Sequence, residues 1–207
     1  SGELANFLVS HFLPAGTHTI TRVTPAQNDT TQVYTLQTVP GPRRTDVPLY
    51  VLVDRRSASA AEHVPFVLQN LGRAKLVGER TPGAGRNNRF VDVGNGFTVS
   101  VSFTRVTDPR TGKEWERVGI QPDIPTSSAD ALRAAHRAAL EGLLAKARDP
   151  KTRAELQRAL AEVLAAPAPA AAPGSTAEFT TLLERIRRQH GLHALAAALI
   201  RGHSIVA

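Results

Sequence analysis

Val47-Pro-Leu-Tyr-Val-Leu-Val53 begins the stretch that decides the fold, because it is a short and nearly continuous apolar run. Such a run is typical of a strand that is buried on both faces. Ser57-Ala-Ser-Ala-Ala-Glu62 then leads into a helical pattern that ends at Leu71-Gly72, and Ala74-Lys-Leu-Val-Gly78 is a second apolar strand. A strand, a helix and a strand in about 30 residues predict a βαβ unit with parallel strands and a right-handed crossover.

The segments on either side of this unit extend the α/β pattern. Residues 115–125 are expected to form a loop in which Val118 and Ile120 point inward. A glycine-rich loop, Thr81-Pro-Gly-Ala-Gly85, follows the second apolar strand. A helix is expected over residues 4–13, and strands are expected over 17–24, 32–39, 90–93 and 97–103.

After residue 126 the pattern changes to helix. Ser127 with Asp130, and Asp149 with Pro150, are typical helix starts, and an apolar stripe follows each of them. Residues 127–165 are therefore predicted to be helices that pack on the preceding domain. The second stripe is expected to be a buried face made of Leu156, Leu160, Val163 and Leu164. Residues 166–176 have the Ala/Pro-rich composition of a linker, and residues 177–207 are predicted to form a small α-helical appendage.

The composition argues against several classes of function. The 207 residues carry a formal net charge of +7, but the arginines are scattered among acidic residues and form no basic stripe with exposed aromatics. Nucleic acid is therefore not an expected partner. The chain has no Cys and its seven histidines are dispersed, so we expect no thiol chemistry, no metal site and no cofactor. No apolar run approaches the length of a membrane span.

Ser59 lies where a buried strand gives way to a helix, and this place suits a nucleophile. The unpaired N–H groups and the positive dipole end of a helix favour a developing oxyanion, and the N–H of Ala60 is the natural donor. Ser59-Ala-Ala-Glu62 is also a capping box, in which the serine needs no catalytic role. The local pattern by itself favours the capping role.

Two longer motifs reverse that preference. Residues 51–62 with 68–81, and Trp115-Glu-Arg-Val-Gly-Ile-Gln-Pro-Asp-Ile-Pro125, resemble the nucleophile region and the closing motif of the tail-specific (C-terminal processing) serine protease family. The resemblance covers about residues 1–160 and is greatest to the lysine-free branch, which includes interphotoreceptor retinoid-binding protein and the tricorn protease core. It implies a crotonase/ClpP-like spiral of βαβ units and serine endopeptidase chemistry on a polypeptide substrate. It also suggests an extracytoplasmic location.

The resemblance assigns roles to individual residues. It makes Ser59 the nucleophile, with the backbone N–H of Ala60 as a donor to the oxyanion. Ala84 stands where the processing branch has a lysine base, so a Ser–Lys pair is not available at that position. Glu116 matches a glutamate of the lysine-free branch, where it either orients the site or only anchors a loop.

The histidine base of that branch is expected upstream of Ser1. Residues 1–126 are therefore expected to hold only the C-terminal part of the catalytic domain, and the chain is expected to be weakly active or inactive. His63 is near the nucleophile in sequence, but we predict that it points away from Ser59. Pro65 is expected to kink or delay its helix, and Arg117 replaces a small residue. The alternative function is a non-catalytic module that binds apolar ligands or peptides, and a homo-oligomer is left open.

Overall fold

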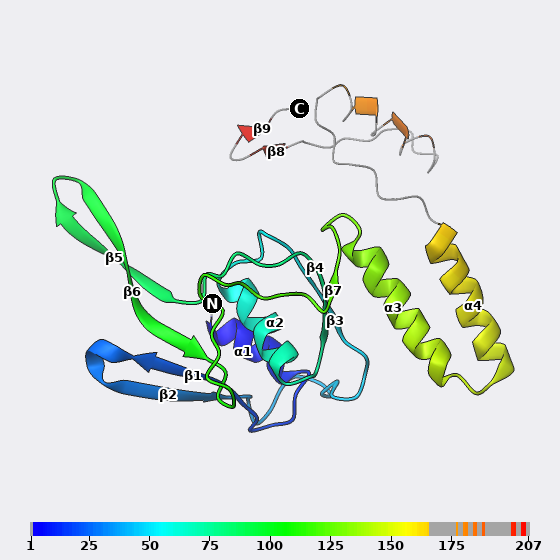
Figure 1. Cartoon of the computed structure of the whole chain (residues 1–207), viewed down its shortest axis with the longest axis horizontal. Helices are drawn as coiled ribbons and strands as arrows, with labels where there is room; N and C mark the ends of the chain where they lie inside the picture. Colours follow the sequence, from blue (N-terminus) through cyan, green and yellow to red (C-terminus); the bar gives the residue numbers. More distant parts are fainter. Residues whose placement is uncertain are drawn as a thin grey trace. The chain divides into compact units, whose positions relative to one another are not determined.

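The predicted βαβ unit is present in the computed structural model of the chain (Figure 1). β3 (Tyr50–Val53) pairs in parallel with β4 (Lys75–Gly78), and α2 (Ala60–Asn70) connects them. β7 (Ile124–Pro125) pairs in parallel with the other edge of β4, which gives a three-stranded sheet in the order β3-β4-β7. The α/β fold class is therefore confirmed, whereas the crotonase/ClpP-like spiral stays a prediction.

The structure describes residues 2–165 without a gap, and after them residues 177, 180, 181, 184, 185, 188, 200, 201, 204 and 205. The chain divides into two compact units, Ser1–Pro167 and Ala168–Ala207. The predicted linker over 166–176 lies outside the described residues, as does most of the predicted appendage. The described residues from 177 to 188 are helical. β8 (Ile200–Arg201) pairs with β9 (Ser204–Ile205) in an antiparallel hairpin that the sequence pattern did not predict.

A four-stranded antiparallel sheet in the order β2-β1-β6-β5 also belongs to the first unit. Its strands are β1 (His18–Thr24), β2 (Asp29–Tyr34), β5 (Asn87–Gly94) and β6 (Phe97–Thr107). β2 lies earlier in the chain than predicted, because a short 3₁₀ turn over Pro25–Gln27 reverses the chain at once. Asn28 completes that reversal in the left-handed conformation, with φ 49°.

β5 and β6 form a long hairpin that extends away from the elements around it (Figure 1). Asn95 and Gly96 at its tip have φ values of 54° and 77°, as a type I′ turn requires. The apolar side chains of β6 occupy every second position from Phe97 to Phe103 and so share one face of the hairpin. Phe90 and Phe97 are 79% and 70% exposed. The hairpin therefore presents large apolar side chains to solvent.

The main core lies between the parallel sheet and the helices α1 (Gly2–Ser10) and α2. Val9 of α1, Leu68 of α2 and Leu76 of β4 belong to the same buried cluster. The other face of the sheet packs against α3 (Ala131–Lys146), whose Ala131 and Ala135 cluster with Val77 of β4. Both helix layers are needed because a parallel pair of apolar strands must be covered on its two faces.

Two of the predictions about burial were wrong. Leu52 of β3 is 44% exposed, although Tyr50 on the same strand face packs against the cluster of Ala131 and Ala135. β3 is therefore covered on both faces at one end only. Val118 is 53% exposed, because the N–H of Gly119 bonds back to the carbonyl of Trp115 and closes a tight turn around it. Ile120 is buried, as predicted.

Pro65 does not delay α2, which begins five residues before it at Ala60. A proline leaves the carbonyl four residues earlier without its helical donor. That residue is Ala61, which is exposed, so water can satisfy its carbonyl. The predicted delay was wrong for this reason.

α3 and α4 (Pro150–Ala165) begin where the sequence predicted. Ser127 Oγ accepts a hydrogen bond from the N–H of Asp130, and the carboxylate of Asp149 accepts one from the N–H of Thr152 at 2.7 Å. α4 packs against α3, but it has no fully buried residue and Leu164 is 55% exposed, so its predicted buried face is only partly covered. Within the described residues, no helix combines the length and the apolar character that crossing a membrane would require.

Candidate active site

Ser59 stands at the turn from β3 into α2 and has an unusual backbone conformation. Its φ is 58° and its ψ is −117°. These are close to the values of the first central residue of a type II′ turn, a position that glycine normally takes. A serine that only caps a helix lies in the β region instead. Holding a non-glycine residue in such a conformation costs about 1–3 kcal/mol, and such residues cluster at functional sites.

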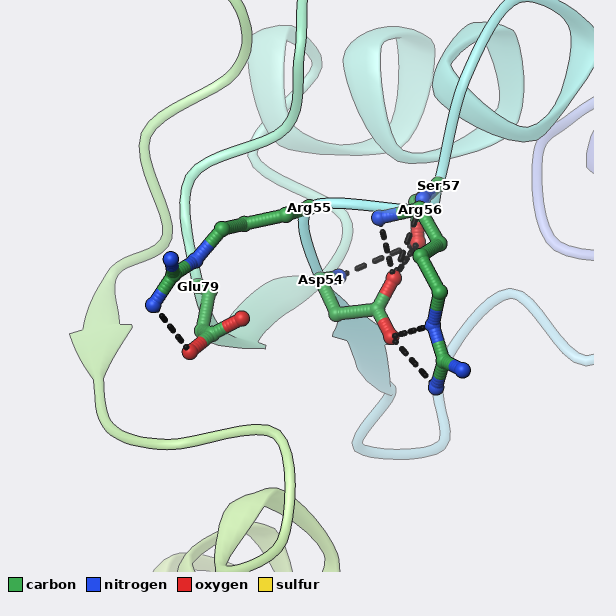
Figure 2. A network of polar contacts seen from close by, with 5 residues as sticks. All are labelled: Asp54, Arg55, Arg56, Ser57 and Glu79. Carbon is green, nitrogen blue, oxygen red and sulfur yellow. Dashed lines mark hydrogen bonds and ion pairs between the residues drawn. The ribbon is translucent and has the colours of Figure 1, made fainter.

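The residues just before Ser59 are held by the carboxylate of Asp54 (Figure 2). Asp54 Oδ1 accepts hydrogen bonds from the N–H groups of Arg56 and Ser57 at 2.8 and 3.0 Å, and also from Ser57 Oγ. The hydrogen bond from the N–H of Arg56 is the main reason why the pKa of Asp54 lies below its usual range. Arg55 points the other way and forms an ion pair with Glu79 at 3.1 Å (Figure 2). The strand end is thus fixed before the chain enters the strained turn.

Glu62 fixes the other side of the turn. Its side chain is fully buried, and its Oε2 accepts the N–H of Ser59 at 2.9 Å. The same carboxylate accepts the N–H groups of Gly83 and Ala84, each at 2.8 Å, and the hydroxyl of Thr81. A buried carboxylate is stable only when its oxygens are well supplied with donors. Glu62 therefore joins the turn at Ser59 to the glycine-rich loop.

The glycine-rich loop lies directly against the segment 115–120. A Cβ on Gly83, which has φ 88°, would stand 2.7 Å from the N atom of Gly119 and 2.8 Å from the carbonyl oxygen of Trp115. No side chain fits at that separation, so glycine is required there. Glu116 Oε2 accepts the N–H groups of Gly85 and Arg86 at 2.8 and 3.1 Å. The contacts of Glu116 are therefore those of a loop anchor.

A cavity of about 540 Å³ opens beside Ser59. Two arginines, Arg22 and Arg86, and one carboxylate, Glu3, give it a mainly positive lining. The residues that line it are Gly2, Glu3, Ile20, Arg22, Ser59, Ala60, His63, Ala84, Gly85, Arg86, Asn87, Asn88, Phe103, Val106 and Trp115. The cavity thus lies where α1, β1, α2, the glycine-rich loop and the base of the β5–β6 hairpin meet. Its volume is within the range of small-ligand sites.

His63 lines the same cavity as Ser59, so the prediction that it points away was wrong. Helical spacing does not decide the relative direction of the two side chains, because Ser59 precedes α2 and has a non-helical backbone conformation. The His63 ring is 7% exposed and stacks on the Trp115 ring, with centroids 6.3 Å apart and planes at 27°. Burial, and secondarily the charge of Arg22, lowers the pKa of His63 to about 4. The ring is therefore neutral near pH 7.

The structure brings together only part of the predicted site. Ser59 and Ala60 both line the cavity, and Ala60 is the first residue of α2, where N–H groups have no partner within the helix. Glu116 is not among the lining residues. The loop-anchoring role of Glu62 went unpredicted, although the capping box had already singled out this residue. Within the described residues, no group of three or more His, Asp or Glu side chains is arranged to hold a metal ion.

The fold and the turn at Ser59 define an α/β protein with a serine of strained backbone conformation between a strand and a helix. Comparison with known proteins agrees with this class. The model of peptidase family S41 matches residues 3–126, which is more than half of the chain. The chain therefore belongs to peptidase family S41, as the motif resemblance predicted.

Individual relatives match a shorter part of the chain. Carboxyl-terminal-processing peptidase 3 of Arabidopsis thaliana, a chloroplastic protein, is 38% identical over 92 residues, which is 44% of this chain and 18% of that protein. The carboxyl-terminal-processing protease of a Picosynechococcus species is 38% identical over 79 residues, which is 38% of this chain and 19% of that protein. The matched part thus spans about a fifth of these relatives.

A solved structure supports the fold. A candidate peptidase from Parabacteroides merdae superimposes with a TM-score of 0.55 at 26% sequence identity. The superposition covers 68% of this chain and 48% of that one.

Proposed function

We propose that this chain carries the nucleophile of a serine-type peptidase and that the nucleophile is Ser59. The observation that carries the proposal is the backbone conformation of Ser59, with φ 58° and ψ −117°. A capping serine does not need this conformation, and it costs stability. A strained turn between a strand and a helix, however, exposes a nucleophile toward substrate. Ser59 is exposed and lines the cavity, in agreement with such a role.

The chemistry follows from the groups around Ser59. Its Oγ attacks the carbonyl carbon of a peptide bond, and the N–H of Ala60 donates to the oxyanion that forms. The carboxylate of Glu62 holds the turn and the glycine-rich loop in register through its bonds to Ser59 and Ala84. Glu116 holds the far end of the same loop, and its orienting role acts through Gly85 and Arg86. Ala84 supplies no amine, so this chain belongs with the lysine-free mechanism.

The substrate and the setting of the whole protein are part of the proposal. The substrate is an extended polypeptide, since the relatives are named for processing of carboxyl termini. The chain spans about a fifth of those relatives, so the activity of a complete enzyme rests on the site described here and on the family. An extracytoplasmic location is proposed on the same basis, and one relative is chloroplastic by name.

The test is covalent labelling of the nucleophile. A biotinylated fluorophosphonate is incubated with the chain, and the labelled peptide is identified by mass spectrometry. We expect the label on Ser59, and we expect Ser59→Ala to abolish it. Ser57→Ala is the matched control, because Ser57 lies in the same turn but its hydroxyl is bonded to Asp54. Labelling that is absent, or that persists undiminished in Ser59→Ala, contradicts the proposal.

A further inference from the structure

The cavity beside Ser59 holds two arginine side chains that the proposed chemistry at Ser59 does not use. Arg22 of β1 and Arg86 of the glycine-rich loop both line it. The Nε atom of each is buried, and neither Nε has a hydrogen-bond partner among the described residues. A buried donor without a partner is uncommon and calls for an explanation, such as a ligand that supplies the acceptor. These two side chains are therefore candidates for contacts with a bound group.

The Arg22 guanidinium lies at the wall of the cavity. Its Nη2 atom would stand 3.5 Å from a Cβ on Gly2, and Gly2 of α1 is one of the lining residues. His63 of α2 lines the same cavity, and the charge of Arg22 reaches its ring. Burial is the larger cause, and Arg22 the smaller, of the lowered pKa of His63. The charged end of Arg22 is thus near residues of both helices that form the wall.

Arg86 is held at both ends. Its backbone N–H donates to Glu116 Oε2 at 3.1 Å, and its guanidinium forms an ion pair with Glu114 at 3.6 Å. Arg105 forms an ion pair with the same oxygen of Glu114, also at 3.6 Å. Guanidinium groups stay charged at every pH at which the protein is folded. One carboxylate cannot balance two of them, so an excess of positive charge remains on this side of the cavity.

Trp115 adds another unpaired donor to the lining. The residue is 3% exposed, and its indole Nε1 has no hydrogen-bond partner in the part of the chain that the structure describes. An indole N–H can only donate. The ring packs against Gly85, the residue before Arg86, since a Cβ on Gly85 would stand 3.2 Å from the ring. Trp115 and Arg86 therefore hold unpaired donors on neighbouring parts of the lining.

Unpaired donors with positive charge select a carboxylate. The planar fork of a guanidinium matches the two carboxylate oxygens, and charge-assisted hydrogen bonds of this kind are among the strong ones in proteins. The carboxylate of the lining itself belongs to Glu3, which is exposed and leaves these donors unpaired. Apolar side chains complete the lining: Ile20, Phe103 and Val106. They suit the methylene groups of a glutamate, whereas a chain-terminal carboxylate has no such stem.

Building on the proposed function, we propose that this cavity binds the side-chain carboxylate of a substrate residue next to the peptide bond that Ser59 attacks. Arg22 and Arg86 set this preference, and the N–H of Trp115 is a further donor. Ser59 and Ala60 line the same cavity, so a substrate residue held there has its backbone beside the nucleophile. The favoured substrate is therefore a polypeptide with Glu, and not Gln, at this position.

The test uses the single tryptophan of the chain, Trp115, as a reporter of the cavity. One Trp gives one indole N–H signal in a proton–nitrogen NMR spectrum, and acetyl-Ala-Ala-Glu-Ala-Ala-amide is titrated beside the same peptide with Gln. We expect the Glu peptide to bind at least about tenfold more tightly, which is about 1.4 kcal/mol, and to shift the indole signal to lower field. Arg22→Gln and Arg86→Gln should each remove this preference. Arg89→Gln, which changes an exposed arginine outside the lining, should keep it.

Further titrations separate the carboxylate site from its alternatives. Ser59→Ala should bind both peptides as wild type does, because the arginines and not the nucleophile hold the carboxylate. Acetyl-Ala-Ala-Ala with a free terminal carboxyl should bind no better than its amide, and binding equal to that of the Glu peptide would assign the cavity to a chain terminus and refute the side-chain assignment.

Two results overturn the proposal as a whole. One is equal or absent binding of the Glu and Gln peptides to wild type, a comparison that needs no variant to fold. The other is a preference for Glu that survives either arginine replacement. Covalent labelling tests the role of Ser59 separately, so the carboxylate site and the nucleophile can each fail alone.

Discussion

Ser59→Gly should be more stable than Ser59→Ala, although glycine normally weakens a fold. The φ of 58° and ψ of −117° cost a residue with a Cβ about 1–3 kcal/mol, and glycine escapes that cost. Glycine is also a somewhat better helix cap than alanine, by a few tenths to about 1 kcal/mol. We therefore expect Ser59→Gly to exceed Ser59→Ala by about 2 kcal/mol in the free energy of unfolding. Both variants should lose fluorophosphonate labelling.

Urea unfolding followed by tryptophan fluorescence measures this difference, because the chain has one Trp and Trp115 is buried in the core. Asp130 provides the matched pair, since it caps α3 with an ordinary φ of −92°. The advantage of glycine over alanine at position 59 should exceed that at position 130 by about 1–2 kcal/mol. Equal advantages at the two positions would refute the claim that Ser59 is strained, and with it the main support for the nucleophile.

Three further predictions follow from the same site. Between about pH 7.5 and pH 5, the free energy of unfolding in urea should fall by about 2 kcal/mol more for wild type than for His63→Phe. The reason is that the unfolded chain binds a proton at His63 near pH 6.5, whereas the pKa of His63 in the folded chain is about 4. Parallel pH curves for the two proteins would contradict the buried neutral ring. Glu62→Ala should lower the free energy of unfolding by about 3 kcal/mol or more, because it leaves four hydrogen-bond donors without their acceptor. Thermal or urea unfolding measures this, and a loss below about 1 kcal/mol would show that water replaces the carboxylate. Gly83→Ala should destabilise the chain by about 2 kcal/mol more than Gly112→Ala, because both glycines have positive φ but only the first would place a Cβ against backbone; similar losses would argue against the close approach.

The sequence was sufficient for the parts of the fold that depend on local pattern. The apolar runs before and after α2 gave the parallel pair, and the caps at Asp130 and Asp149 gave the starts of α3 and α4. Burial of single residues was harder to predict, because it depends on where a neighbouring element ends. Leu52 and Tyr50 lie on the same face of β3, yet only Tyr50 packs against α3, and Leu52 is exposed.

The part of the candidate site that could be predicted is the part that lies within a recognisable sequence motif. The strand-to-helix turn at Ser59 was predicted, because a strand, a serine and a helix start are visible in the sequence; the catalytic roles of Ser59 and Ala60 stay predictions. The positive φ of Ser59 was not, because serine gives no sign of it in the way that glycine would. His63 was misplaced because helical spacing was applied to Ser59, which lies before the helix and has a non-helical backbone conformation. The partners of Glu62 in the glycine-rich loop are more than 18 residues away and leave no local signal.

The β5–β6 hairpin has a practical consequence for work with this chain in solution. A row of valines and phenylalanines on one face, beside the open edge of β5, is the kind of surface on which protein molecules adhere to one another. Salts that strengthen the hydrophobic effect, such as ammonium sulfate, should therefore precipitate the chain at low concentrations of the salt. Exchanging Phe90 and Phe97 for threonine keeps the strand propensity of the hairpin and should raise the solubility limit without touching the serine turn.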